Sequence, residues 1–432
     1  MYPIIQLYTN RIYRPGSRGS CFFMFLLLCG LLSACAPTVP GTQVPDRVPQ
    51  LISQRELGEE ELLNVAIQVF NPGKLPQNEQ QGRGLSPEIR EAEARFIPVH
   101  LKYTMQRTGY WGTVRVVPND DNGSEVLVKG TIEYSDGESV VLKIEAIDSR
   151  NVVWFRKTYA ETANPAEQNR TEPEKKDIFQ DLFNTVANDL AMYRNSLQSA
   201  EILEIQRIAE IRYGAEMIPE VFGRYLTVDN SGRIHLVHLP AVDDPMLERI
   251  KKIKTRDDML VDAINGYYEA YYIDLWEPYA NWRKYRTEEV TAMRTLERQA
   301  LAQQVLGVAA IVGAIALGAA SDEDTRVRTS TLQDVMLAGG AYAIYSGIQK
   351  NQETKINKEA IEELGVSFSL EAEPLVLEVE GETVRLTGSA EQQYARWRNL
   401  LKEIYARETG LIDSTLATDA SLHPSATNGP QK

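Results

Sequence analysis

VLVKGTIEYSDGESVVLKIEAIDS, residues 126–149, carries the clearest secondary-structure signal of the chain. Its two halves are rich in Val and Ile, and the tripeptide SDG (135–137) between them has the composition of a hairpin turn. We therefore expect strands at 126–132 and 140–147 that pair as an antiparallel hairpin. A second turn leads into VVWF, residues 152–155, which predicts a further strand.

The segments before this hairpin predict a strand followed by a helix. NVAIQVF, residues 64–70, is a strand candidate that the following NPG terminates. Ser86 and Pro87 form a typical helix start, with serine as the N-cap and proline at the first helical position. Pro98 is expected to kink this helix. The apolar residues of the helix recur at helical spacing and comprise Ala92, Phe96, Val99 and Tyr103.

Two further segments complete a first domain, which we place at residues 56–198. Residues 113–117 are mostly β-branched and predict one of three or four antiparallel strands. Residues 177–194 predict a closing helix with one apolar face. The order strand, helix, three or four antiparallel strands and helix indicates an α+β fold, with a mixed or antiparallel sheet and two helices.

This domain resembles the periplasmic domain shared by the N-terminal part of TolB and the curli-secretion lipoproteins. The likeness rests on an early strand that ends in Phe-Asn-Pro, residues 70–72, and on the hairpin followed by VVWFRKTY. The segment DSRN, residues 148–151, stands where those families have an Asp-x-x-Gly turn, and asparagine can adopt the left-handed conformation of the glycine. The resemblance implies a module that contacts other proteins in envelope assemblies, although fold alone does not establish function.

The N-terminus contains an export signal that ends in FLLLCGLLSAC, residues 25–35. The apolar run 21–32 has twelve residues, too few to span a bilayer as a helix, and three arginines with no acidic residue precede it. Leu-Ser-Ala-Cys, residues 32–35, resembles a bacterial lipobox. The resemblance implies removal of residues 1–34 by cleavage between Ala34 and Cys35, and acylation of Cys35 by palmitate or a similar chain. An uncleaved anchor and a signal without lipid are the alternatives.

The lipobox also implies a location at the periplasmic face of the outer membrane, because Ala36 rather than aspartate follows the cysteine. A diacyl anchor with a third acyl chain exceeds the two signals that stable attachment requires. The mature chain would keep one cysteine, already lipidated, so no disulfide within the chain is expected. Loss of the three leader arginines takes the formal charge from −14 to −17, which argues against nucleic acid as a partner.

The chain outside the first domain falls into segments of different character. Residues 35–55 are rich in proline and are read as the lipidated cysteine with an extended tether. Residues 199–304 are charged and predict long helices. Residues 351–410 predict a small unit of strands and one helix, which begins with a capping box at 389–392. Residues 411–432 are rich in Ser, Thr, Ala and Pro and are expected to be disordered.

The aromatic stretch YYEAYYIDLWEPYANWRKY, residues 267–285, has three interpretations. A packing seam between long helices explains the helical spacing of its rings most simply. Trp276, Tyr279 and Trp282 could instead stack on peptidoglycan sugars, because their rings are flat and apolar with polar edges. A subunit interface is the third interpretation.

Residues 305–350 contain two Gly- and Ala-rich apolar runs and predict a helical hairpin. Small residues at i, i+4 spacing would let helix backbones approach closely. The hairpin could be buried in this chain or against sister subunits. It could instead be inserted into the outer membrane or contribute to an oligomeric pore, or the segment could be poorly ordered or lie at a lipid surface. The small residues are Ala310, Ala314 and Gly318 in the first run, and Gly339, Ala343 and Gly347 in the second.

No catalytic motif stands out, and we expect neither an enzyme nor a cofactor nor a metal. His235 and His238 lie in an expected strand, where a spacing of three directs them to opposite faces. Asp243 and Asp244 are read as the start of a helix. The sequence therefore favours a non-enzymatic lipoprotein that contacts the membrane through its anchor and binds envelope proteins or itself. A pore component and a peptidoglycan binder are the alternatives.

Overall fold

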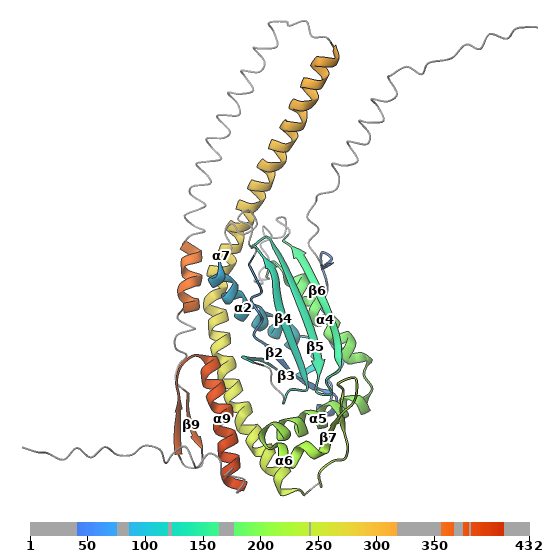
Figure 1. The fold of residues 1–432 in the computed structure, drawn as a ribbon, viewed down its shortest axis with the longest axis vertical. Coiled ribbons are helices and arrows are strands. Elements are labelled where there is room, and N and C mark those ends of the chain that lie inside the picture. The colour runs from blue at the N-terminus through green and yellow to red at the C-terminus, as the bar shows by residue number, and fades with distance from the viewer. Residues whose placement is uncertain are drawn as a thin grey trace, which may run out of the picture. The chain divides into compact units, whose positions relative to one another are not determined.

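The computed structural model describes residues 41–75, 86–119, 123–163, 177–241, 243–317, 356–366, 375–379 and 382–409. The fold is α+β, as the sequence predicted, and its centre is a six-stranded mixed sheet (Figure 1). The strand order is β1-β6-β5-β4-β2-β3. The bounds are Thr42–Gln43 for β1, Leu63–Gln68 for β2, Trp111–Val117 for β3, Val126–Ser135 for β4, Ser139–Asp148 for β5 and Val153–Thr162 for β6.

The hairpin expected at residues 126–149 is confirmed as β4 and β5. The two strands pair antiparallel from Val126 opposite Asp148 to Ser135 opposite Val140. Gly137 in the turn has φ +90°, which suits glycine, and Asn151 in the next turn has φ +60°. The latter value confirms the left-handed asparagine expected in place of the turn glycine.

The strand expected at residues 113–117 is confirmed as β3, but the expectation that it pairs antiparallel is wrong. β3 pairs in parallel with β2, and β2 pairs in parallel with β4. The early strand therefore lies between β3 and the hairpin. The helix that connects β2 to β3 makes this parallel pairing feasible, because it gives the chain the crossover that parallel neighbours need.

Helices α2 (Pro87–Gln106) and α4 (Gln180–Ser196) pack on one face of the sheet. Ser86 caps α2 as predicted, since its hydroxyl accepts a hydrogen bond from the backbone N–H of Ile89 at 3.1 Å. Pro98 lies inside α2, and its missing N–H leaves the carbonyl of Ala94 without a helical donor. The backbone N–H of Phe70 donates to that carbonyl at 2.9 Å, which joins α2 to the end of β2.

The predicted tether at residues 35–55 is shorter than expected, because its described part lies against the domain. β1 pairs in parallel with β6 at Tyr159 and Ala160. Farther along, the backbone N–H groups of Val48 and Leu51 donate to side chains of α4, Asp181 and Asn188 respectively. Proline-rich sequence has no helix or internal strand pairing of its own, so strand β6 and side chains of α4 satisfy backbone groups of this segment.

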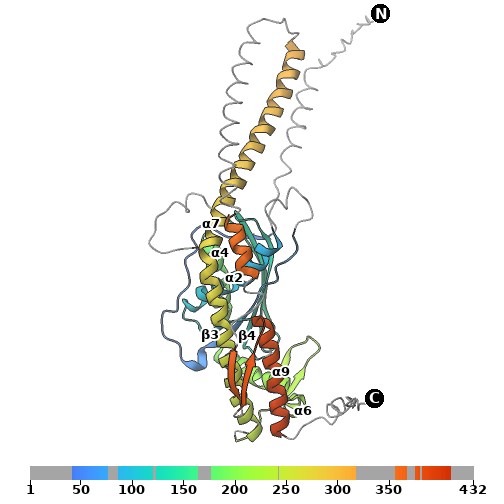
Figure 2. The same cartoon turned by 90° about the vertical axis from the view of Figure 1, so that its left-hand side faces the viewer.

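The middle of the chain is helical, as expected for 199–304, but its last helix passes the predicted boundary at residue 304. α7 extends from Pro245 to Leu317 (Figure 2). The preceding elements, including two short 3-10 turns (η), are η1 (Glu59–Glu61), α5 (Ser199–Met217), α6 (Pro219–Phe222), η2 (Gly223–Tyr225), β7 (Leu226–Val228) and β8 (Ile234–Leu236).

The C-terminal unit contains β9 (Leu375–Val379), β10 (Glu382–Leu386) and α9 (Ala390–Thr409), after a helical segment at 356–366. The two strands pair antiparallel, and the capping box is confirmed. Gln392 N–H donates to the Ser389 hydroxyl, and the Gln392 side chain accepts from the Ser389 N–H, both at 3.3 Å. Trp397 is 1% exposed and its indole N–H donates to Asp257 of α7, which fixes α9 against α7.

Candidate functional site: the seam between helix α7 and the domain

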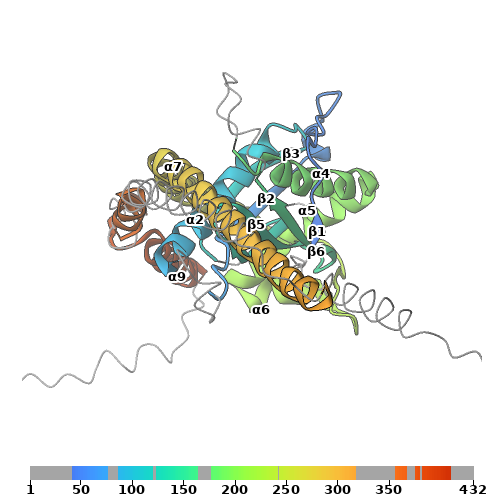
Figure 3. The same cartoon turned by 90° about the horizontal axis from the view of Figure 1, so that it is seen from above.

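The best-defined candidate site is the seam where α7 packs on α2, which Figure 3 shows from above. The aromatic stretch 267–285 lies on α7 at this seam. The ring of Phe96 in α2 is the centre of the contact: its centroid lies 4.5 Å from that of Tyr272 and 4.9 Å from that of Tyr279. Trp282 stacks on Tyr279 with centroids 5.8 Å apart. The packing interpretation of this stretch is therefore confirmed.

The interpretation of Tyr279 and Trp282 as sugar-stacking residues needs correction, whereas Trp276 is only partly covered. Tyr279 is 2% exposed and Trp282 1%, so neither offers a ring face to a glycan. Trp276 is half-buried, with its ring 5.9 Å from those of Phe96 and His100. Helical spacing identified a continuous face, but spacing alone could not say that the chain itself covers it.

A buried ion pair lies at one end of the seam. Arg283 of α7 donates two hydrogen bonds to the carboxylate of Asp177, at 3.0 and 2.6 Å, and both side chains are at most 4% exposed. Burial opposes the charge of Arg283, but Asp177 outweighs it and raises the pKa of the guanidinium. The pKa of Asp177 is lowered because Arg283 more than offsets the burial of the carboxylate. The Arg283 guanidinium also lies 4.2 Å from the Tyr279 ring centroid.

A second buried polar group joins α7 to the sheet. Glu93 of α2 accepts hydrogen bonds from the hydroxyls of Tyr279 at 2.7 Å and Ser135 at 2.5 Å. Arg90, one turn earlier, lies 3.2 Å from the other oxygen of the same carboxylate. Arg90 also donates to backbone carbonyls at the end of β4. One carboxylate therefore connects α2, the β4–β5 turn and α7.

α7 also covers the edge of the sheet at β3. The side-chain oxygen of Asn265 accepts a hydrogen bond from the Val116 N–H at 2.7 Å, and Asn265 is 4% exposed. Arg115 extends from the same strand and forms a bidentate pair with Asp262, at 2.7 and 3.1 Å. These contacts occupy backbone and side-chain groups that an edge strand would otherwise present to other chains.

His100 of α2 lies inside the seam in a defined tautomer. Its Nε2 is 3.0 Å from the Gln180 side-chain oxygen, and its Nδ1 is 2.8 Å from the Tyr272 hydroxyl. The Gln180 amide nitrogen donates to Asn184, so its oxygen is the acceptor for His100. Nε2 therefore carries the proton and Nδ1 accepts from Tyr272. With 4% exposure and both nitrogens satisfied, His100 is suited to structure rather than to proton transfer.

We expect His100 to make the stability of the chain depend on pH. Burial lowers its pKa below the ordinary 6.5, although Asp177 opposes this effect. Because the unfolded chain then binds the proton more readily, the contribution of His100 is complete above about pH 6.5. It is lost as the pH falls, by at most about 1.4 kcal/mol per pH unit. Urea unfolding at several pH values should show a smaller loss in His100→Gln than in the native chain.

Glu161 provides the control, because its effect has the opposite sign. Burial raises the pKa of this carboxyl to about 8, so its contribution is complete below about pH 4.5 and is lost as the pH rises towards 8. Glu161→Gln should therefore flatten the decline on the alkaline side and leave the difference between native and His100→Gln intact. An identical profile for native and His100→Gln would contradict the prediction.

The remaining residues noted in the sequence do not gather into a site. His235 is half-buried and lies 2.7 Å from Asp229, while the His238 ring lies 5.0 Å from that of Tyr225. Asp244 accepts from the Met246 N–H at the start of α7, as expected for a helix start. Among the described residues, no group of three or more His, Cys, Asp or Glu side chains could hold a metal ion.

Several predicted site residues lie where side-chain contacts are not defined. Ala34, Cys35, Gly318, Gly339, Ala343 and Gly347 are outside the described residues. Ala310 and Ala314 lie in the last part of α7, so their helical conformation is confirmed. Within the described part of the chain, no helix is both long enough and apolar enough to cross a membrane.

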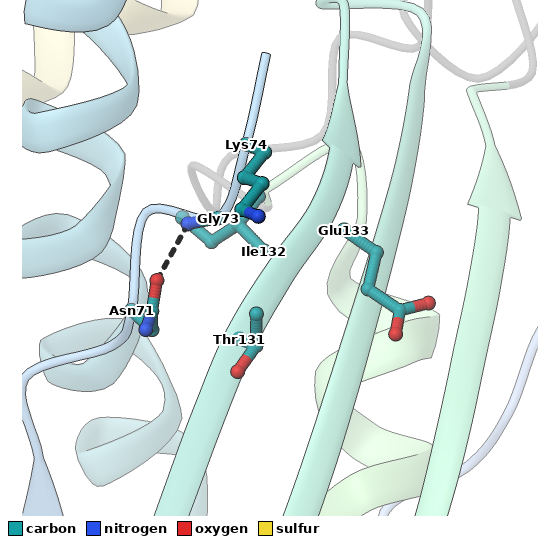
Figure 4. A pocket seen from close by; sticks show the side chains of 6 residues that line it. All are labelled: Asn71, Gly73, Lys74, Thr131, Ile132 and Glu133. Atoms are coloured by element: carbon teal, nitrogen blue, oxygen red, sulfur yellow. Dashed lines mark hydrogen bonds between the residues drawn. The ribbon is translucent and has the colours of Figure 1, made fainter. Parts of the chain in front are cut away.

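One shallow depression of about 550 Å³ lies beside β4 (Figure 4). Its lining includes Gly73, which has φ +70° and approaches β4 so closely that a Cβ would lie 2.1 Å from the Ile132 carbonyl oxygen. The side chain of Asn71 accepts from the Gly73 N–H at 2.8 Å. Lys74 and Glu133 are exposed at this site and form no catalytic arrangement with the other lining residues.

The polar residues of the seam were not identified from the sequence. Asp177 and Arg283 are 106 residues apart, and neither belongs to a local motif. A weak signal existed at Arg90 and Glu93, because a spacing of three places opposite charges side by side on a helix. That spacing indicates the ion pair, but it does not show its burial or identify the distant partners.

Comparisons with known proteins identify no relative of this chain. The chain matches no protein-family model, no curated protein and no solved structure.

Proposed function

We propose that this protein is a non-enzymatic lipoprotein of the outer membrane, attached through Cys35 and facing the periplasm. The support is the leader sequence: three arginines, a twelve-residue apolar run and Leu-Ser-Ala-Cys in the order of a lipobox. The resemblance of residues 56–198 to periplasmic domains of envelope assemblies agrees with this location.

We infer a scaffold role, in which the protein binds other envelope proteins or its own copies. The observation that supports this role is the seam between α7 and the domain. A helix that continues to Leu317 is fixed on the domain by two buried carboxylate groups and a continuous aromatic contact. Such a seam fixes part of a long helix on the domain, as a scaffold requires, and its described polar groups are used in contacts within the chain.

A secretion or pore component is the second candidate. It is favoured by the continuation of α7 through Ala310 and Ala314, so that the helix enters the Gly- and Ala-rich segment 305–350 without a break before Leu317. In this alternative the segment 305–348 would enter the membrane. The peptidoglycan binder loses its main support, because Tyr279 and Trp282 are buried.

Cys35→Ala tests the location and separates the two candidates. The scaffold lipoprotein should lose acyl labelling and appear in the soluble periplasmic fraction, because the anchor is its attachment to lipid. A pore component should lose acyl labelling but stay in the membrane fraction. Cys29→Ala, which leaves Leu-Ser-Ala-Cys intact, is the matched control and should behave as the native chain. A mature protein that retains residues 1–34 would overturn the proposal.

A further inference from the structure

One face of α7, opposite the seam residues, is covered by none of the described residues and has an ordered pattern. It exposes two large apolar side chains, Met259 at 64% and Ile273 at 66%. They are fourteen residues apart, which is four helical turns, and small residues lie between them. At Gly266, midway between them, no atom lies within 4 Å of the position of an added Cβ. The helix surface there faces open space.

We call this face the α7 stripe. Its residues recur at alternating spacings of four and three, the pattern of a helix that packs along another helix. The glycine and alanines would let a second helix approach closely between the larger side chains. The α7 stripe comprises Lys252, Arg256, Met259, Ala263, Gly266, Ala270, Ile273, Glu277 and Ala280.

The charges of the α7 stripe are divided between its ends. Lys252 and Arg256 are exposed before Met259, while Glu277 follows Ile273, with Asp274 beside it. None of these four side chains has an ion-pair partner among the described residues. A second α7 in parallel orientation would place like charges together. An antiparallel copy would place the basic end of one helix against the acidic end of the other.

We propose that two copies of this chain associate through the α7 stripe, antiparallel, with the two Gly266 residues at the crossing point. The pattern is self-complementary about that glycine: Met259 of one copy faces Ile273 of the other, and Arg256 lies beside Glu277. This is the condition for an interface with twofold symmetry. In the proposed scaffold, a second copy of the chain is thus one of the partners. The dimer depends on α7 and not on the lipid anchor, so it should persist when Cys35→Ala releases the protein from the membrane.

Single cysteines in the full chain, purified in detergent and oxidised, test the geometry. Gly266→Cys lies on the proposed axis and should form a disulfide-linked dimer. Met259→Cys should not, because the two copies of residue 259 would be about 21 Å apart along the helices, beyond the Cα separation of about 4–7 Å that a disulfide allows. The double variant Met259→Cys/Ile273→Cys should restore the dimer. The native chain, oxidised in the same way, is the control for disulfides formed by the cysteines already present.

Sedimentation of the chain without added cysteines gives a second measurement. Ile273→Glu should weaken self-association at least about tenfold, because it places a charge in the apolar contact. Val228→Glu changes an equally exposed apolar residue of β7 and should have no effect. A monomeric native chain would overturn the proposal. The proposal would also be overturned if Met259→Cys formed dimers as abundant as those of Gly266→Cys. The same holds if Gly266→Cys formed disulfides only within one chain or with a different protein.

Discussion

Arg283→Met is expected to lower the free energy of unfolding by about 3–5 kcal/mol, because it leaves the Asp177 carboxylate buried without its cation. Asp177 keeps a hydrogen bond from the Phe179 N–H, but it loses both donors of the guanidinium. Methionine fills much of the space, so the loss reflects charge rather than a cavity. Urea unfolding followed by tryptophan fluorescence measures the change, and Trp282 next to Arg283 in the sequence reports on the seam directly.

The double variant Arg283→Met/Asp177→Asn is the matched control. It removes both charges together, and it should recover more than half of the loss because the uncompensated carboxylate is gone. Asp177→Asn alone should cost a similar amount to Arg283→Met, since the guanidinium is then buried alone. Additive losses in the double variant, or a single-variant loss below about 1 kcal/mol, would show that the two groups do not act as a buried pair.

The sequence was informative where structure is local. Ser86 and Ser389 identified two helix starts, and the Gly137 turn identified the hairpin, because each depends on residues within a few positions. The place of β2 between β3 and β4 was not predictable, since parallel pairing brings together strands about fifty residues apart and leaves no local signal. The fold class could therefore be predicted from the sequence, whereas the order of the strands could not.

Only part of the candidate site could be predicted from the sequence, for the same reason. The apolar periodicity of 267–285 predicted a packed face on α7. What that face contacts depends on Phe96 and Glu93, and on Asp177, which lies just before α4. Tyrosine and tryptophan serve both for packing and for ligand stacking. Burial distinguishes the two uses, and burial follows from the complete fold.

Trp282→Ala should be as damaging as loss of the ion pair, with a decrease of about 3–5 kcal/mol in the free energy of unfolding. The ring is 1% exposed, stacks on Tyr279 and lies against the β4–β5 turn, where a Cβ on Gly137 would be 3.5 Å from the indole. Its removal would leave a cavity between α7 and the turn. Neighbouring Thr287, whose hydroxyl donates to the Gly137 carbonyl at 3.0 Å, limits the collapse of that cavity.

Trp276→Ala is the matched control, because Trp276 lies on the same helix but is half-buried, so its loss should cost less than half as much. The pair of variants also tests the peptidoglycan interpretation. If these tryptophans bound sugars, both variants would stay as stable as the native chain and would lose co-sedimentation with purified sacculi. Because the indole of Trp282 is enclosed by its own chain, we expect the reverse: a large loss of stability in Trp282→Ala, and no selective loss of sacculus binding in the folded Trp276→Ala.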